Sequence, residues 1–210
     1  MIDKMIRTIV FDLGGVLIDL DIVACIRACR EEIGFDKAAE LLDPCHQKGI
    51  FQKLEAGEVS PEEFAAEVLK MCRPGTTVEE VAHAFRKLLV GVDQRKVELL
   101  KELGQKYELY LLSNNNAISM PSSKKMFEDL GIPMDKLFKK LFLSYEMHLL
   151  KPSDEIYQEA IRQIGGEPSE MLFVDDSQIN VDAAIRNGMQ SICYKPGTCL
   201  RTALSEVLND

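Results

Sequence analysis

The sequence predicts an α/β fold, a doubly wound parallel sheet into which an all-helical subdomain is inserted. Short apolar runs alternate with helical patterns over most of the chain, which is the order typical of a parallel sheet covered by helices on both faces. Residues 20–91 depart from that order, because helical patterns follow one another there with no strand between them. We therefore expect an α/β core of residues 1–19 and 92–210 and a helical insertion of residues 20–91.

Four short apolar runs are predicted to form the strands of this sheet: residues 8–11, 109–112, 171–174 and 191–194. They are largely continuous in their apolarity and do not alternate strictly with polar residues. A strand that is buried on both faces shows such a run, whereas a half-exposed strand alternates. The runs therefore favour a parallel sheet with both faces covered.

Residues 94–104 and 153–164 are predicted to form helices of the core. In the second helix, Ile156, Ala160, Ile161 and Ile164 form one apolar stripe that would pack on the sheet. Sheets of this kind place their ligand site at the carboxyl ends of the strands. The functional residues are therefore expected in the segments that directly follow each strand.

The insertion contains two clear helix starts. Ser60 is followed by a proline and, three residues on, by Glu63, and Thr77 has the same spacing to Glu80. A serine or threonine with a glutamate three residues later is the pattern of a capping box, which satisfies the free backbone N–H groups of a first helical turn. These signals support an all-helical insertion.

Composition excludes several classes of protein. The chain has 34 acidic and 25 basic residues, a formal net charge of −9, which argues against a nucleic-acid partner or an anionic membrane surface. The start, MIDKMIRTIVFD, has too short an apolar run for a signal core, and no apolar stretch is long enough to span a membrane. We expect a cytoplasmic protein whose six cysteines are reduced.

The strand ends and one helix start carry polar residues that can perform chemistry together. They are Asp12, Ser113, Asn114, Lys151, Asp175 and Asp176. Three converging carboxylates repel one another unless a cation lies between them, and oxygen ligands without histidine favour Mg²⁺. A lysine and a serine hydroxyl can hold phosphate oxygens, and an aspartate can attack phosphorus. The set predicts metal-assisted phosphoryl transfer.

Four segments resemble, in order, the motifs of the haloacid dehalogenase superfamily. They are FDLGGVLIDL, LLSNNN, the lysine of LLKPSDEIY, and FVDDSQINVDAA followed by NGM. The insertion after the first motif is similar to that superfamily's small helical cap of the first type. The resemblance covers nearly the whole chain and implies the phosphatase branch of the superfamily. Bacterial glucose-1-phosphate phosphatase-like members are similar through both cap and core.

This resemblance implies a magnesium site. Asp12 would be both the nucleophile and a ligand, and the carbonyl oxygen of Gly14 would be a second ligand. Asp176 would complete the site, with Asp175 beside it and bound directly or through water. Asn180 lies one turn beyond Asp176 and fits either an ordinary surface role or support of these carboxylates.

The resemblance also implies a phosphate site. The Ser113 hydroxyl and the backbone amide of Asn114 would bind the transferring phosphoryl group. Lys151 would pair with Asp12 and neutralise the phosphoryl charge. In the insertion, His46, Lys48 and Lys53 are expected to be solvated or structural, although the cap is where this family reads its substrate.

One position departs from the family pattern. Most phosphatases of the superfamily carry a second aspartate two residues after the nucleophile, as the acid that protonates the leaving group, and this chain has Gly14 there. Asp19 and Asp21 follow closely and are expected to lie in a turn and a helix cap. Either is also a candidate for supplying the missing proton.

The leading functional prediction is a Mg²⁺-dependent phosphatase that hydrolyses a small phosphorylated metabolite, plausibly a sugar phosphate, through an aspartyl-phosphate. Two alternatives stay open. A 2-haloacid dehalogenase also uses a strand-end aspartate, but it needs no metal, and the Asp175–Asp176 pair would serve no purpose there. A catalytically weak phosphate-binding or regulatory protein is the other alternative, because Gly14 cannot donate a proton. The oligomeric state is open.

Overall fold

The computed structural model describes residues 5–42 and 49–208. Its centre is a five-stranded parallel sheet with the strand order β5-β4-β1-β6-β7. The strands are β1 Thr8–Phe11, β4 Glu108–Ser113, β5 Lys140–Leu143, β6 Met171–Asp175 and β7 Gln190–Cys193. The predicted doubly wound parallel sheet is confirmed, and the four predicted runs match β1, β4, β6 and β7 closely.

Strand β5 was not predicted from the sequence. It pairs with β4 at one edge of the sheet, in a register that sets Lys140 opposite Tyr110. Its apolar run, Leu141–Leu143, is short and follows two lysines, so it has no clear strand signal of its own. Pairing with β4 and packing of Phe142 against Tyr110, with ring centroids 6.1 Å apart, define this strand.

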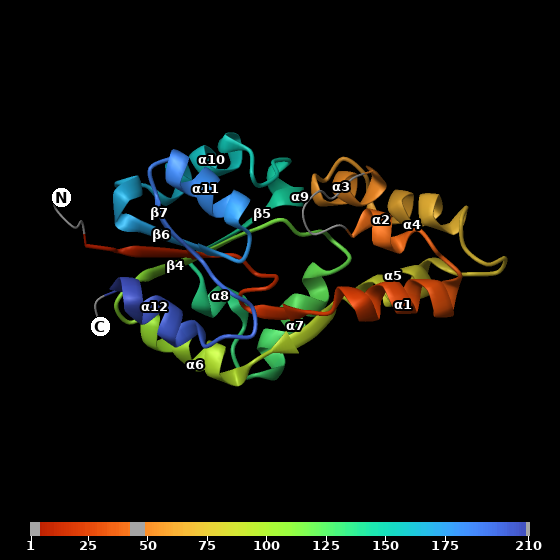
Figure 1. The fold of residues 1–210 in the computed structure, drawn as a ribbon, viewed down its shortest axis with the longest axis horizontal. Coiled ribbons are helices and arrows are strands. Elements are labelled where there is room, and N and C mark those ends of the chain that lie inside the picture. The colour runs from red at the N-terminus through yellow and green to blue at the C-terminus, as the bar shows by residue number, and fades with distance from the viewer. Residues whose placement is uncertain (1–4, 43–48, 209–210) are drawn as a thin grey trace.

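Helices cover both faces of the sheet (Figure 1). Helices α10 and α11 lie on one side, and α6 and α12 lie on the other. The helical elements of the core are α6 Gln94–Leu103, α7 Met120–Asp129, α8 Met134–Leu137, α9 Ser144–Met147, α10 Asp154–Ile164, the 3₁₀ turn Pro168–Glu170, α11 Gln178–Arg186 and α12 Leu200–Leu208. The predicted helices 94–104 and 153–164 correspond to α6 and α10.

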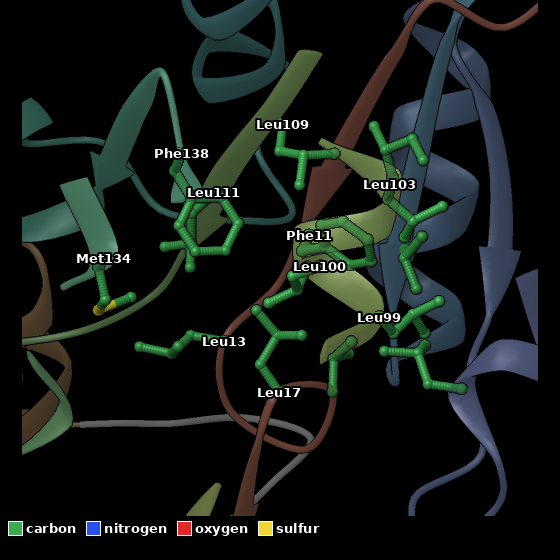
Figure 2. Close-up of a cluster of buried hydrophobic side chains, with 14 of the residues drawn as sticks. Phe11, Leu13, Leu17, Leu99, Leu100, Leu103, Leu109, Leu111, Met134 and Phe138 are labelled. Carbon is green, nitrogen blue, oxygen red and sulfur yellow. The ribbon is translucent and has the colours of Figure 1, made fainter. Parts of the chain in front are cut away.

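Adjacent residues of β1 enter separate hydrophobic cores. Phe11 packs with Leu100 of α6, whereas Val10 packs with Tyr157 of α10, because successive strand residues point to opposite faces. Figure 2 shows Phe11 among leucines of α6 and β4. Full burial of each such side chain contributes roughly 1.5–3 kcal/mol to the free energy of folding. Burial on both faces also explains why the sequence of β1 is a continuous apolar run.

The inserted segment forms a separate group of helices at one end of the sheet (Figure 1). These helices are α1 Ile22–Ile33, α2 Ala38–Leu41, α3 Gly49–Glu55, α4 Pro61–Leu69 and α5 Val78–Arg86. They share their own apolar core, in which the Phe64 and Phe85 rings meet edge to face with centroids 5.0 Å apart. Both predicted capping boxes are present, at Ser60 and at Thr77.

The prediction that residues 20–91 contain no strand is wrong at the ends of that segment. Strand β2, Ile18–Leu20, pairs antiparallel with β3, Leu89–Val92, and sets Asp19 opposite Gly91. This two-stranded sheet joins the helical group to the core. Neither short strand is recognisable alone, because their pairing depends on a contact between distant parts of the chain.

Within the described residues, the longest helices are too short and too polar to cross a lipid bilayer.

Candidate active site

The parallel register brings the predicted strand-end residues to one edge of the sheet. Strands β4 and β6 flank β1 on its two sides, so the polar residues at their ends surround Asp12. A cavity of about 660 Å³ opens between this edge and the helical group. Of the predicted site residues, the cavity is lined by Asp12, Gly14, Ser113, Asn114, Lys151 and Asp176.

Asp12 is held rigidly at the base of the cavity. Its Oδ1 accepts hydrogen bonds from the Leu13 backbone N–H at 2.7 Å and pairs with the Lys151 ammonium at 2.9 Å. These contacts use one carboxylate oxygen and leave Oδ2 for other chemistry. Burial raises the pKa of Asp12 to about 7, against the opposing attraction of Lys151 and with added repulsion from Asp175 and Asp176.

Lys151 is the cationic centre of the site. Its side chain is only 1% exposed, and its ammonium donates to Asp175 Oδ2 at 2.7 Å and to the Leu112 carbonyl at 3.1 Å, besides its ion pair with Asp12. Burial alone would lower the pKa of Lys151, but the adjacent Asp12 and Asp175 carboxylates raise it above its usual value. The ammonium is therefore a permanent positive charge beside Asp12.

The three aspartates form one acidic cluster. Oxygen atoms of Asp12, Asp175 and Asp176 all lie within 4.8 Å of one another. Burial and the Asp175 charge raise the pKa of Asp176 above its usual range. A set of closely spaced oxygen donors, with repulsion that a cation would relieve, fits Mg²⁺.

Asp175 and Asp176 differ in their surroundings. Asp175 is fully buried, and its Oδ1 accepts from the Ser177 N–H at 2.8 Å and from Asn180 Nδ2 at 3.0 Å, while its Oδ2 accepts from Lys151. Asp176 lines the cavity. Of the two roles considered for Asn180, the structure therefore favours the one in which it supports the Asp175 carboxylate. Ser177 is the N-cap residue of α11 and makes no side-chain cap bond.

A glycine that the sequence reasoning did not single out is required beside Asp176. Gly15 has φ +74°, and a Cβ built on it would lie 2.1 Å from Asp176 Oδ2. Any side chain at this position would collide with the carboxylate and strain the backbone. The second glycine of the first motif thus lets Asp176 approach the turn after β1.

The segment after β4 is fixed by its own amide side chains and by α9. Asn114 exchanges two hydrogen bonds with the Lys151 backbone, at 2.9 and 3.0 Å, which ties the two predicted phosphate-binding segments together. The Asn115 N–H donates to Ser144 Oγ at 2.9 Å, and the Ser113 side chain is buried at the cavity edge. No sequence pattern points to Ser144, because its role depends on where α9 packs.

Helix α3 forms part of the cavity wall that faces the sheet edge. Gln52 and Glu55 of this helix line the cavity, and sequence reasoning missed both. Lys53, considered from sequence, is exposed and is not among the lining residues. His46 and Lys48 lie outside the described residues.

The structure does not support Asp19 or Asp21 as the missing proton donor. Asp19 lies in β2, not in a turn, and pairs with Lys96 at 2.8 Å. Asp21 caps α1 as expected, by accepting from the Ala24 N–H at 2.8 Å. Neither lines the cavity. Asp19 and Asp21 are close to Asp12 in sequence but do not reach the cavity, because β2 carries the chain away from the nucleophile toward α1.

The comparison with family models decides the identity of this fold. The model of the haloacid dehalogenase-like hydrolases matches residues 6–188. The chain belongs to this family. The resemblance indicated by the four motifs is thereby confirmed, and the protein is a hydrolase of the haloacid dehalogenase-like type.

Curated relatives match this hydrolase over nearly its whole length. A D-ribitol-5-phosphate phosphatase of Bacteroides thetaiotaomicron is 36% identical over 206 residues, which is 98% of this chain and 100% of the relative. A sesquiterpene phosphatase of Aspergillus oryzae is 27% identical over 87% of each chain. Both relatives carry names of phosphatases.

Solved structures agree with this hydrolase in both the core and the helical insertion. A haloacid dehalogenase-like hydrolase from Porphyromonas gingivalis superposes with a TM-score of 0.90 at 36% identity, over 99% of this chain and 100% of that one. An enzyme of Bacteroides thetaiotaomicron, in complex with magnesium and inorganic phosphate, has a TM-score of 0.87 at 33% identity, over 94% and 98%. An L-2-haloacid dehalogenase, at 18% identity and a TM-score of 0.60, shares the fold alone.

Proposed function

We propose that this hydrolase is a Mg²⁺-dependent phosphatase that acts on a small polyhydroxylated phosphate monoester, a sugar or sugar-alcohol phosphate. The observation that carries the proposal is the Asp12–Lys151 ion pair of 2.9 Å in a cavity that also exposes Ser113 and Asp176. The D-ribitol-5-phosphate phosphatase and the magnesium–phosphate complex of the Bacteroides enzyme support it.

In this proposal, Asp12, Asp176 and the Gly14 carbonyl hold Mg²⁺, and Asp175 supports the site from behind. The donor set fits this ion because its carboxylate oxygens lie within 4.8 Å of one another, and among the described residues the group that could hold a metal here consists of aspartates alone. When bound, the ion supplies positive charge that offsets the charge of the phosphoryl oxygens. Lys151 supplies a second positive charge beside Asp12.

The first chemical step uses Asp12 as the nucleophile. Its Oδ2 attacks phosphorus in line, the bond between phosphorus and the ester oxygen breaks, and the phosphoryl group is transferred to the carboxylate. The departing oxygen takes its proton from a water molecule, and the hydroxide left behind takes up the proton that the attacking water releases in the second step. Ser113 Oγ and the Asn114 N–H hold the phosphoryl oxygens, and Lys151 favours the ionised form of Asp12 and aligns it through Oδ1.

The second step restores the enzyme. A water molecule attacks phosphorus, the bond to Asp12 breaks, and inorganic phosphate leaves, so that one ester and one water give one alcohol and one phosphate. The helical group, residues 20–91, would act as the cap that covers the cavity during both steps and excludes bulk water. The dehalogenase alternative and the weak phosphate-binding alternative have no observation in their favour comparable to the acidic cluster.

The test is turnover by the purified protein. Phosphate release from 4-nitrophenyl phosphate and from a panel of sugar and sugar-alcohol phosphates should require Mg²⁺ and disappear with a chelator. The Asp12→Asn variant should fold and lose at least about 1,000-fold in kcat, because an amide does not attack phosphorus. Wild-type protein that releases no phosphate from any ester, or chloride release from 2-chloropropionate in a chelator, would overturn the proposal.

A further inference from the structure

The helical group supplies one wall of the cavity, and this wall combines apolar with polar residues. Among its described lining residues, six are apolar, and Gln52 and Glu55 are polar. The apolar ones are Leu20, Ile22, Leu42, Phe51, Leu88 and Leu89. Gln52 and Glu55 lie three residues apart on α3, so they occupy the same face of one helix. A polar pair in an otherwise apolar wall marks a specific contact with the organic part of a ligand.

Glu55 is an unusual residue for such a wall. It is only 4% exposed, and glutamate is seldom buried to that extent without a specific role. Gln52, by contrast, is exposed. Glu58, three residues beyond Glu55, is also exposed and is not among the lining residues. Of the charged residues Lys53, Glu55 and Glu58, Glu55 is therefore the one that is buried and the one that lines the cavity.

The position of Glu55 is fixed relative to the site. The Ser144 hydroxyl donates to the Glu55 carbonyl at 2.6 Å and accepts from the Asn115 N–H at 2.9 Å. Asn115 follows the Ser113–Asn114 segment directly, so one buried serine links α3 to the phosphate-binding segment. In Figure 1, α3 and α9 lie next to each other at the junction of cap and core. The backbone of Glu55 is therefore tied to the Ser113–Asn114 segment, and the residue lines the same cavity as that segment.

We propose that Glu55 and Gln52 are the specificity-determining residues of the cavity, and that they bind hydroxyl groups of the alcohol portion of the substrate. The inference rests on the proposed phosphatase function. A carboxylate accepts hydrogen bonds from hydroxyl groups, and an amide both donates and accepts them. A simple alkyl chain at the same place would cover the carboxylate with apolar surface, so the pair selects polyhydroxylated esters and rejects alkyl esters. The surrounding apolar residues pack on the carbon chain.

The experiment compares two esters with similar leaving groups. Ribitol 5-phosphate and pentyl phosphate have the same chain length, but only the first carries hydroxyl groups on the chain. We expect wild-type kcat/KM to favour ribitol 5-phosphate by about 100-fold or more. Glu55→Leu should lower this ratio by about 10- to 100-fold, Gln52→Leu by about 3- to 10-fold, and Glu55→Gln by an intermediate amount. Glu58→Leu is the matched control and should leave the ratio unchanged.

A third substrate separates failure of this inference from failure of the phosphatase proposal. Hydrolysis of 4-nitrophenyl phosphate needs the phosphate site but no chain hydroxyl, so Glu55→Leu and Gln52→Leu should lower its kcat/KM far less than that for ribitol 5-phosphate. Gln52 is exposed, so its variant tests the inference even where Glu55→Leu does not fold. Wild-type enzyme that hydrolyses 4-nitrophenyl phosphate without preferring ribitol 5-phosphate, or variants that lose all three substrates equally, would overturn the inference.

Discussion

The ammonium of Lys151 lies 2.7 Å from the carboxylate of Asp175, and both side chains are sealed from solvent, with exposures of 1% and 0%. Lys151 also pairs with Asp12 at 2.9 Å. One buried cation thus balances two buried anions at the centre of the site. The Lys151 ammonium therefore affects both the stability of the fold and the charge of the Asp12 side chain.

Removal of this cation should destabilise the protein strongly. Lys151→Met would leave the Asp12 and Asp175 carboxylates buried without their partner, which costs about 3–5 kcal/mol in comparable cases. Urea unfolding at pH 7.5 measures the loss. The double variant Lys151→Met/Asp175→Asn removes one of the two uncompensated charges and should recover part of it. A loss below about 1 kcal/mol for Lys151→Met would contradict the assignment of this cation as the balancing charge.

Magnesium binding should depend on pH through Asp12. In the metal-free protein the Asp12 pKa is about 7, well above the ordinary aspartate value of 3.8, so between pH 4 and 7 the folded state holds a proton that the unfolded chain has already lost. This group therefore lowers stability as pH rises through that window. Because Mg²⁺ needs the carboxylate, its affinity should fall by up to about tenfold per pH unit below pH 7 and level off above it.

Calorimetric Mg²⁺ titrations at pH 6, 7 and 8 measure this dependence, and the rise in melting temperature with Mg²⁺ should be larger at pH 8 than at pH 6. Asp12→Asn carries no titrating group at this position. Its residual Mg²⁺ binding should therefore lose most of the pH dependence. Equal wild-type affinity at pH 6 and pH 8 would show that Asp12 is not protonated in the metal-free protein.

The Ser144 side chain should contribute more to the free energy of unfolding than another buried serine does. Ser144→Ala removes the partner of the Glu55 carbonyl and of the Asn115 N–H, and leaving buried polar groups unsatisfied costs about 1–3 kcal/mol. Ser123→Ala is the matched control, because the hydrogen bond of the buried Ser123 hydroxyl within the described residues goes to the Ser119 carbonyl at 3.2 Å, four residues earlier in the same segment. Urea unfolding should show a larger loss for Ser144→Ala. Equal losses would mean that Ser144 does not link cap and core.

The site residues that directly follow strands of the sheet were predicted from the sequence. Those whose position depends on how short helices pack against the rest of the molecule were missed. Asp12 and Asp175 were found because each ends a continuous apolar run, and parallel strands bring such ends together. Glu55 and Ser144 lie on the short helices α3 and α9, and the sequence pattern of a short helix does not predict which element it packs against. Asp19 was misplaced for a related reason, since its pairing with Gly91 joins distant parts of the chain.

The absence of an acid at Gly14 should make the rate depend steeply on the leaving group. General acid catalysis contributes about 10²–10⁴ in rate, most where the departing oxygen is strongly basic. Negative charge builds on that oxygen in the loose transition state of phosphoryl transfer. We expect log kcat/KM to fall steeply with leaving-group pKa across aryl and simple alkyl phosphates that carry no chain hydroxyls, so that Glu55 and Gln52 do not bias the series.

A carboxyl group placed at position 14 should flatten this dependence. A Cβ at Gly14 would lie 3.1 Å from Leu20 Cδ1, which is tight, so Gly14→Asp is best combined with Leu20→Ala to provide room. The double variant should gain about tenfold or more on alkyl phosphates relative to aryl phosphates, because the new carboxylic acid protonates the basic alkoxide and the aryl leaving group needs no such help. Leu20→Ala alone is the control and should keep the steep wild-type slope. A wild-type slope as shallow as that of the double variant would mean that a group already in the cavity supplies the proton.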